Sequence, residues 1–406
     1  MEIAVQYLEG GSHAARVSPA EARARLRAAF ERVPFAMVLL GWDLDPRVVE
    51  ACAEECALHQ SDLYLWQPLL TGHGTHRPDP AWHVVALDNR PVAGHAHKPE
   101  FTFICPNRPG VRESVLQNLS AALAGGYYRG VFLDRIRFPS PAGDLAGRFG
   151  CFCDACYEAS RQADLDLSVV REDLLRLVTT REGKKAAIRC MLSTSSGRDH
   201  SLQRMLAFRQ RSVSALVRQV ADMAMAQGLK VGLDCYSPTF APIVGQDLAV
   251  LGDHCDWIKV MTYVRAYGPA SLPFEILALA NWLITSEGES ESAALDFLAK
   301  ATGWSLPTSR EEVREGRLSA SILTEELRRG RVRHAHHLFA GIELVEIPQV
   351  AQLNTDQIRQ DSEAVLAGAP DGVVLSWDLA HMPLDRLDLA NLLYRRPIGE
   401  ELGIRN

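Results

Sequence analysis

The chain has 406 residues and a net charge of −7, and 47% of its residues are hydrophobic and 23% charged. This composition is ordinary for a globular protein with a large core. The acidic charge argues against nucleic acid or a membrane surface as the main partner, because such binding depends on clustered Lys and Arg. No apolar run approaches the ~18 residues that span a bilayer, and we expect no secretory signal.

Eight apolar runs predict strands buried on both faces, and the segments between them have helical periodicity. The predicted strands are 35–41, 62–66, 101–105, 130–134, 230–234, 257–263, 339–346 and 372–378. The predicted helices are 19–32, which opens with the capping box Ser18-Pro19-Ala20-Glu21, then 46–58, 111–123, 202–227 and 355–368. Eight strands that alternate with helices indicate an α/β fold, the (β/α)8 TIM barrel.

Two connections, about 139–202 and 264–335, are too long to be simple loops. They follow the fourth and sixth predicted strands, so we expect insertions on the C-terminal face of the barrel. No linker or internal repeat divides the chain. We therefore expect a single TIM-barrel domain over 1–406, with the barrel at about 35–396.

Polar and charged side chains gather where the predicted strands end, and in a TIM barrel this is where the active site forms. These residues are Asp43, Asp134, Arg137, Asp234, Tyr263, Glu343, Glu346 and Asp378. A single carboxylate there is explained by a helix N-cap. Several carboxylates at the ends of buried strands are costly unless they are hydrogen-bonded or functional. Together they predict a convergent acidic site.

A cysteine cluster follows the fourth predicted strand, where Cys151, Cys153 and Cys156 form C-F-C-D-A-C. Thiolates at this spacing bind one tetrahedral zinc if a fourth ligand is supplied from elsewhere, and the alternative is three ordinary loop cysteines. Cys105, at the end of the third predicted strand, is a candidate for that ligand. The nine cysteines are an odd number, which does not suit a disulfide framework, so we expect a reducing, cytoplasmic location.

The Cys-Pro-Asn-x-Pro that begins at Cys105, followed by C-x-C-x-x-C from Cys151, resembles the structural zinc site of glycoside hydrolase family 42, the TIM-barrel β-galactosidases. The resemblance covers about 100–160 and implies a structural Zn²⁺ held by Cys105, Cys151, Cys153 and Cys156. The stretches GVFLDRIRFP, DWIKVMTY and GVVLSWDL resemble uncharacterised families of TIM-barrel glycoside hydrolases. Family 42 ends its fourth strand with Asn-Glu, whereas this chain has Leu133-Asp134, so the identity of the acid does not carry over.

Glycoside hydrolysis needs two carboxyl groups that flank the scissile bond. The resemblance implies that the fourth and seventh strands supply them, which favours Asp134 as acid/base and Glu343 or Glu346 as nucleophile. Strand alternation points the two glutamates to opposite faces, and Gly341 shares the parity of Glu343, so Glu343 is favoured.

Asp234 is the reserve acid. If a pair with Arg137 dominates the environment of Asp134, then Asp134 becomes a sugar-binding or nucleophilic residue instead.

Other residues are candidates for substrate binding. The resemblance implies that Tyr263 hydrogen-bonds the nucleophile. Trp377 and Asp378 suit ring stacking and hydroxyl binding, although plain core packing equally explains the tryptophan. Asp43 follows the first predicted strand, and His73 follows the second and has a loop role as its alternative.

The leading interpretation is a carbohydrate-active hydrolase with a structural zinc. A second is a divalent-metal-dependent hydrolase or isomerase that uses Asp134, Asp234 and Glu343 as ligands. A third is a barrel that binds a saccharide without turnover. The sequence leaves open the sugar, the linkage, the stereochemical outcome and whether the chain forms a homo-oligomer.

Overall fold

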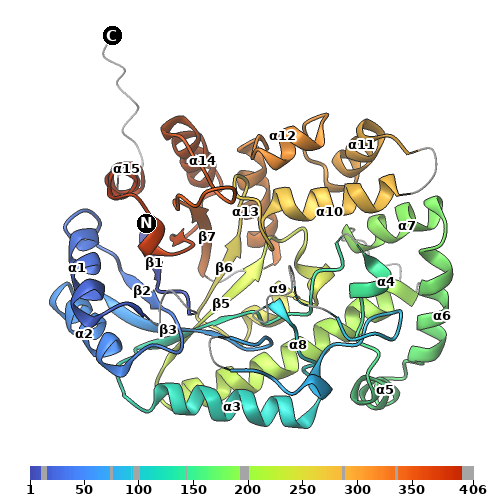
Figure 1. The fold of residues 1–406 in the computed structure, drawn as a ribbon, viewed down its shortest axis with the longest axis horizontal. Coiled ribbons are helices and arrows are strands. Elements are labelled where there is room, and N and C mark those ends of the chain that lie inside the picture. Colours follow the sequence, from blue (N-terminus) through green and yellow to red (C-terminus); the bar gives the residue numbers. More distant parts are fainter. Residues whose placement is uncertain are drawn as a thin grey trace.

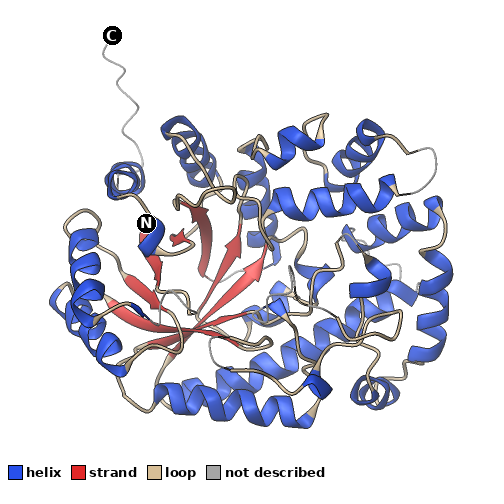
Figure 2. Cartoon of the chain, viewed as in Figure 1, coloured by secondary structure: helices blue, strands red, loops and turns tan. Residues whose placement is uncertain are grey.

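Eight parallel strands close into a barrel in sequential order, with helices around it (Figure 1 and Figure 2). The structure is a computed structural model that describes residues 1–10, 16–73, 76–92, 94, 101–142, 144–192, 201–285, 289–333 and 337–395. The strands are β1 (Glu2–Tyr7), β2 (Met37–Leu40), β3 (Asp62–Pro68), β4 (Gly130–Asp134), β5 (Lys230–Tyr236), β6 (Trp257–Met261), β7 (His337–Glu343) and β8 (Gly372–Ser376). The predicted (β/α)8 TIM barrel is confirmed.

The strands differ from the prediction at two places. One strand was not predicted and one predicted strand does not form, so the number of strands stays the same. β1 was not predicted, because Glu2 and the inward-facing Gln6 interrupt its apolar run. The strand predicted at 101–105 is wrong: Phe103 and Ile104 form only isolated antiparallel bridges within the connection between β3 and β4. Short apolar runs do not reveal by themselves whether they pair inside the barrel.

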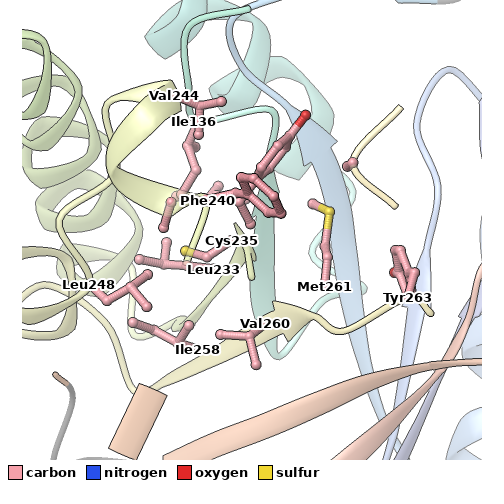
Figure 3. Packing of buried hydrophobic residues seen from close by; sticks show 14 of the residues in the cluster. Ile136, Leu233, Cys235, Phe240, Val244, Leu248, Ile258, Val260, Met261 and Tyr263 are labelled. Atoms are coloured by element: carbon pink, nitrogen blue, oxygen red, sulfur yellow. The ribbon is translucent and has the colours of Figure 1, made fainter. Parts of the chain in front are cut away.

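The barrel has separate inner and outer packing layers, as strand alternation requires. Large side chains pack together inside the barrel, among them Trp66, Phe132, Trp257 and Phe339. On the outer face the strands pack against helices and short turns. Figure 3 shows Leu233, Ile258, Val260 and Leu248 in this outer layer, with Met261 and Tyr263 lying apart from them.

The helices follow the predicted pattern closely. The capping box at Ser18 opens α1 (Pro19–Phe30), with the Ser18 and Glu21 side chains bonded to each other's backbone N–H groups. The other helices that alternate with strands are α2 (Pro46–Leu58), α3 (Pro109–Leu123), α8 (Ser201–Ala226), α9 (Leu248–Gly252), α13 (Ser321–Arg333), α14 (Thr355–Ala367) and α15 (Leu384–Tyr394). Within the described residues, no helix is both long and apolar enough to cross a membrane.

The two long insertions form helices that meet on one side of the barrel (Figure 1). The first contains α4 (Leu145–Arg148), α5 (Asp154–Arg161), α6 (Leu167–Leu177) and α7 (Arg181–Leu192), and the second contains α10 (Leu272–Ile284), α11 (Glu291–Thr302) and α12 (Arg310–Arg314). Lys184 of α7 donates a hydrogen bond to the carbonyl of Trp282 in α10 at 3.0 Å, and Arg181 and Lys185 pair with Glu289. These contacts join the insertions to each other.

Candidate active site

A cavity of about 470 Å³ lies at the C-terminal ends of the strands, the position of active sites in TIM barrels. Its lining combines carboxylates with aromatic rings, which is the combination that sugar-binding sites use for hydroxyl groups and ring faces. The charged residues in the lining are Glu9, Asp134, Arg135, Arg137 and Asp234, and the aromatic residues are Trp66, Phe101, Tyr263, Tyr267, Phe274 and Trp377.

Asp134 and Asp234 occupy neighbouring positions at the base of this cavity. Leu133 of β4 pairs with Leu233 of β5, so the next residue of each strand stands beside the other. Adjacent strands lie about 4.8 Å apart. Asp134 Oδ2 accepts a hydrogen bond from Trp66 Nε1 at 3.0 Å, and its Oδ1 accepts the backbone N–H of Arg135.

Asp234 sits above a fully buried lysine. Lys259 Nζ donates to Asp234 Oδ2 and to Gln6 Oε1, each at 3.1 Å. Ser376 Oγ donates to the same Gln6 oxygen at 2.7 Å, so a polar network joins β5, β6, β1 and β8. The pKa of Asp234 is raised to about 7, mainly by burial and in part by the neighbouring Asp134, whereas Lys259 opposes the shift. A carboxyl group in this position is partly protonated at neutral pH and can donate a proton.

Two arginines follow Asp134, and their surroundings differ. Arg135 Nη2 pairs with Glu9 Oε1 at 3.1 Å, and Nη1 donates to Thr71. Arg137 lies with its guanidinium 4.4 Å from the ring centroid of Phe103. The Arg135 charge is therefore balanced by a carboxylate, whereas the Arg137 charge lies against an aromatic ring.

Trp377 and Tyr263 form one aromatic wall of the cavity. Their ring centroids are 5.7 Å apart in an edge-to-face arrangement, and the Trp377 side chain is half-buried. Burial raises the pKa of Tyr263 well above its ordinary value, so its hydroxyl stays protonated and able to donate a hydrogen bond. The half-buried indole has exposed surface on which a sugar ring can stack.

Glu343 has the inward parity that was predicted but does not line this cavity. Its Oε1 accepts the backbone N–H of Ala266 at 2.7 Å, and its Oε2 accepts that of Arg265 at 3.0 Å. Burial raises the pKa of Glu343 to about 8, against the effect of these two hydrogen bonds. The carboxyl group thus anchors the loop after β6, and the structure does not bring it into the cavity with Asp134.

Glu346 and Asp378 also lie outside the cavity lining. The Glu346 side chain is 57% exposed beyond the end of β7 and pairs with Arg386 at 3.2 Å. Asp378 is buried and accepts three backbone N–H groups, from Leu8 and Glu9 after β1 and from Ala380. Asp378 therefore fastens the end of β1 to the end of β8.

Asp43 and His73 come together, but in a second cavity of about 430 Å³ between β2, β3 and the helices that follow them. His73 Nδ1 lies 3.1 Å from Asp43 Oδ2, and its Nε2 lies 3.3 Å from the amide nitrogen of Gln67. Trp42 borders this second cavity and packs edge-to-face on Trp66 of the first at 5.2 Å. The rings of Trp42 and Trp66 thus separate the Asp43–His73 pair from the cavity that Asp134 lines.

The four predicted cysteine ligands converge. The sulfurs of Cys105, Cys151, Cys153 and Cys156 all lie within 4.8 Å of one another, and the four side chains are buried. The Cys105 Sγ is 3.4 Å from that of Cys156 and 3.6 Å from that of Cys153. Four thiolates around one Zn²⁺ at about 2.3 Å stand about 3.8 Å apart in a tetrahedron, so the observed cluster fits such an ion.

Three N–H groups already point at these sulfurs, and one of them is the backbone N–H of Asn107, which donates to Cys105 Sγ at 3.4 Å. Val85 N donates to Cys151 Sγ and Asn107 Nδ2 to Cys156 Sγ, each at 3.3 Å. Hydrogen bonds of this kind orient and stabilise thiolate ligands. Within the described residues this is the one group of three or more converging metal-ligating side chains, and the structure does not bring Asp134, Asp234 and Glu343 together as such a group.

Several site residues were not predicted. Gln6 and Glu9 belong to β1 and its following loop, and the failure to predict that strand hid both. Lys259 had a visible signal, a lysine inside the apolar strand sequence WIKVM, since a lysine buried on a strand needs a partner. Tyr267 and Phe274 come from the second insertion, whose position over the cavity depends on tertiary packing.

Replacing Asp378 with alanine tests its structural role. Asp378→Ala leaves the buried Leu8 N–H and its neighbours without an acceptor, which should cost roughly 2–4 kcal/mol of unfolding free energy. Urea unfolding measures this loss, and Glu363→Ala, at an exposed position of α14, should change stability by less than about 0.5 kcal/mol. Unchanged stability combined with weaker saccharide binding would instead return Asp378 to its predicted role in hydroxyl binding.

Solved structures with a similar fold include several carbohydrate-active enzymes. They include the PgaB (BpsB) glycoside hydrolase domain of Bordetella bronchiseptica (TM-score 0.50, 11% identity, 93% of this chain and 94% of that chain covered). The catalytic domain of β-amylase from Paenibacillus polymyxa has a TM-score of 0.53, with 10% identity and 93% and 92% coverage. Alpha-L-fucosidase isoenzyme 2 from Paenibacillus thiaminolyticus has a TM-score of 0.50, with 12% identity and 97% and 49% coverage. No family model and no curated protein sequence matches this chain.

Proposed function

We propose that this protein is a glycoside hydrolase in which Asp134 and Asp234 form the reacting pair of carboxyl groups. The observation that carries the proposal is the register between β4 and β5, which sets the two side chains beside each other in an aromatic-lined cavity. The similarity to carbohydrate-active TIM barrels is in the fold and supports the proposal only to that extent.

The different environments of the two carboxyl groups suit different roles. Asp234, whose pKa burial raises to about 7, is the general acid that gives a proton to the glycosidic oxygen as the bond to the anomeric carbon breaks. Its Oδ2 is engaged by Lys259, while Oδ1 has no hydrogen-bond partner among the described residues. Oδ1 is thus the oxygen that has no bond to give up, and in the proposal it is the one that bonds to the substrate.

Asp134 balances the positive charge that develops at the anomeric carbon. It does so either by bonding to that carbon or by taking a proton from the attacking water. Trp66 and the backbone of Arg135 hold its carboxylate in a fixed orientation. The pair therefore replaces the predicted pair of Asp134 and Glu343.

The proposal includes a structural Zn²⁺ held by Cys105, Cys151, Cys153 and Cys156. The ion would clip the connection between β3 and β4 to the first insertion, because Cys105 lies in the former and the other three cysteines lie in the latter. Closed four-cysteine sites of this type stabilise folds and leave no position for substrate. The ion therefore takes no part in the reaction.

Asp134→Asn is expected to lower kcat at least ~10³-fold while the protein keeps its fold, since it removes the group that balances the transition-state charge. Turnover of a panel of aryl-glycosides and oligosaccharides measures the loss. Glu343→Gln is the matched control: it lies outside the cavity, so its kcat should stay near that of the wild type while its stability changes. A large kcat loss in Glu343→Gln with normal turnover in Asp134→Asn would reverse the assignment. Saccharide binding without turnover in the wild type would leave only a binding protein.

Cys153→Ser is expected to lower bound zinc, measured by elemental analysis, and to lower the melting temperature by roughly 5–10 °C, because a four-thiolate site contributes several kcal/mol to folding. Cys190→Ser, at a half-buried position on α7, should leave metal content unchanged. Equal metal content in the two variants would rule out the zinc site.

A further inference from the structure

Among the described residues, each cationic side chain around the cavity pairs with a carboxylate, with one exception. Arg135 pairs with Glu9, and the buried Lys259 pairs with Asp234. Arg137 is only 5% exposed, lines the cavity, and has no ion pair with any described residue. Its Nε is buried without a hydrogen-bond partner. Among the described residues, the positive charge of Arg137 at the cavity wall thus has no carboxylate in contact with it, although it acts on Asp234 and Glu275 from farther away.

The guanidinium of Arg137 is held where it is by its neighbours. It lies between two rings, 4.4 Å from the centroid of Phe103 and 4.6 Å from that of Tyr236. Its Nη1 donates to the carbonyl of Phe138 at 3.3 Å. These contacts stabilise the cation but do not neutralise it, because an aromatic face carries only a quadrupole.

A buried carboxyl group in the same region, Glu275, is already engaged. Its Oε1 accepts the Tyr236 hydroxyl at 3.1 Å and the backbone N–H of Ala270 at 3.3 Å, and Ser140 Oγ donates to its Oε2. Burial also raises the pKa of Glu275, which disfavours its charged form. Glu275 therefore forms no ion pair with Arg137, although the nearby Arg137 charge opposes the rise of its pKa.

A buried charge without a partner is costly, and a bound anion removes that cost. We propose that the saccharide accepted by this cavity carries a carboxylate, as in a uronic acid residue, and that this carboxylate pairs with Arg137. The inference rests on the proposed function and names its substrate class. A planar guanidinium matches a planar carboxylate, and Asp134 in the same cavity would repel a doubly charged phosphate more strongly than a singly charged group.

Binding of matched saccharides to the wild-type protein tests this inference. The probes are oligosaccharides of glucuronate, galacturonate and mannuronate, their carboxyl-reduced neutral counterparts, and neutral oligosaccharides that carry a sulfate ester. Calorimetry should show at least one uronate that binds about tenfold or more tightly than its reduced counterpart, as expected for a charged hydrogen bond. Equal affinity within every pair, binding of the sulfate ester alone, or no binding at all would overturn the inference.

A variant pair locates the effect at Arg137. Arg137→Gln should abolish the difference in affinity between the uronate and its neutral counterpart, and Arg137→Lys should retain part of that difference. Arg218→Gln, at an exposed position on α8, should leave the preference intact. If Arg137→Gln keeps the full preference, the carboxylate binds elsewhere and the inference fails. The matched ligands decide the question on the wild type even if a variant does not fold.

The outcome is separable from the proposed function. A protein that prefers uronates but cleaves no glycosidic bond keeps this inference and loses the hydrolase. A protein that cleaves neutral glycosides with no preference for a uronate keeps the hydrolase and loses this inference.

Discussion

The pairing register of β4 with β5 is the constraint on which the site depends. It places Asp134 and Asp234 at neighbouring positions of a closed barrel, where both side chains share the inner face. Two carboxylates that close repel each other, and burial makes their joint ionisation costlier still. Lys259 beneath Asp234 offsets part of this cost, and a proton on Asp234 relieves the remainder. Asp234 therefore keeps its proton to a higher pH than an ordinary aspartate does.

The surrounding architecture holds this pair in position. The network from Lys259 through Gln6 to Ser376 links strands on opposite sides of the barrel interior. The connection between β3 and β4 contributes Phe103, which packs on Arg137, and two residues later Cys105, which belongs to the thiol cluster. The zinc ion proposed for the cysteine cluster would thus hold in place the segment that packs on the guanidinium, although the cluster lies outside the cavity.

The fold could be predicted from sequence because buried parallel strands are continuous apolar runs, and because the missed strand β1 and the wrongly predicted strand at 101–105 offset each other in the count. The cysteine cluster was predictable because thiol spacing is a local property.

Glu343 shows the limit of such reasoning. Strand parity predicted an inward direction, but the backbone N–H groups of Arg265 and Ala266 that bind its carboxylate belong to a loop after another strand. Glu343 lines a small cavity shared with residues of α14 and not the cavity of Asp134. Such contacts depend on loop conformation, which the alternation of a strand does not encode.

The roles of residues were hardest to predict where polar side chains stabilise the barrel by hydrogen bonds and do not line the candidate active site. Asp378 ends an apolar strand as a catalytic carboxylate would, yet it accepts N–H groups from the end of β1, a strand that was not predicted. Asp43 and His73 were each predicted to follow a strand. In the structure they pair with each other in a separate cavity, on the far side of Trp42 and Trp66. Position at a strand end therefore selects candidates, and contacts between elements decide among them.

The pH dependence of turnover tests the central claim most directly. If Asp234 is the acid, kcat/KM of the wild type should fall as pH rises through about 7, because the proton needed by the leaving group is lost as its carboxyl ionises. With an aryl-glycoside whose leaving group departs without proton assistance, Asp234→Asn should remain active, and its alkaline decline near pH 7 should disappear. An unchanged decline in Asp234→Asn would contradict the account, because the proton would then come from another group.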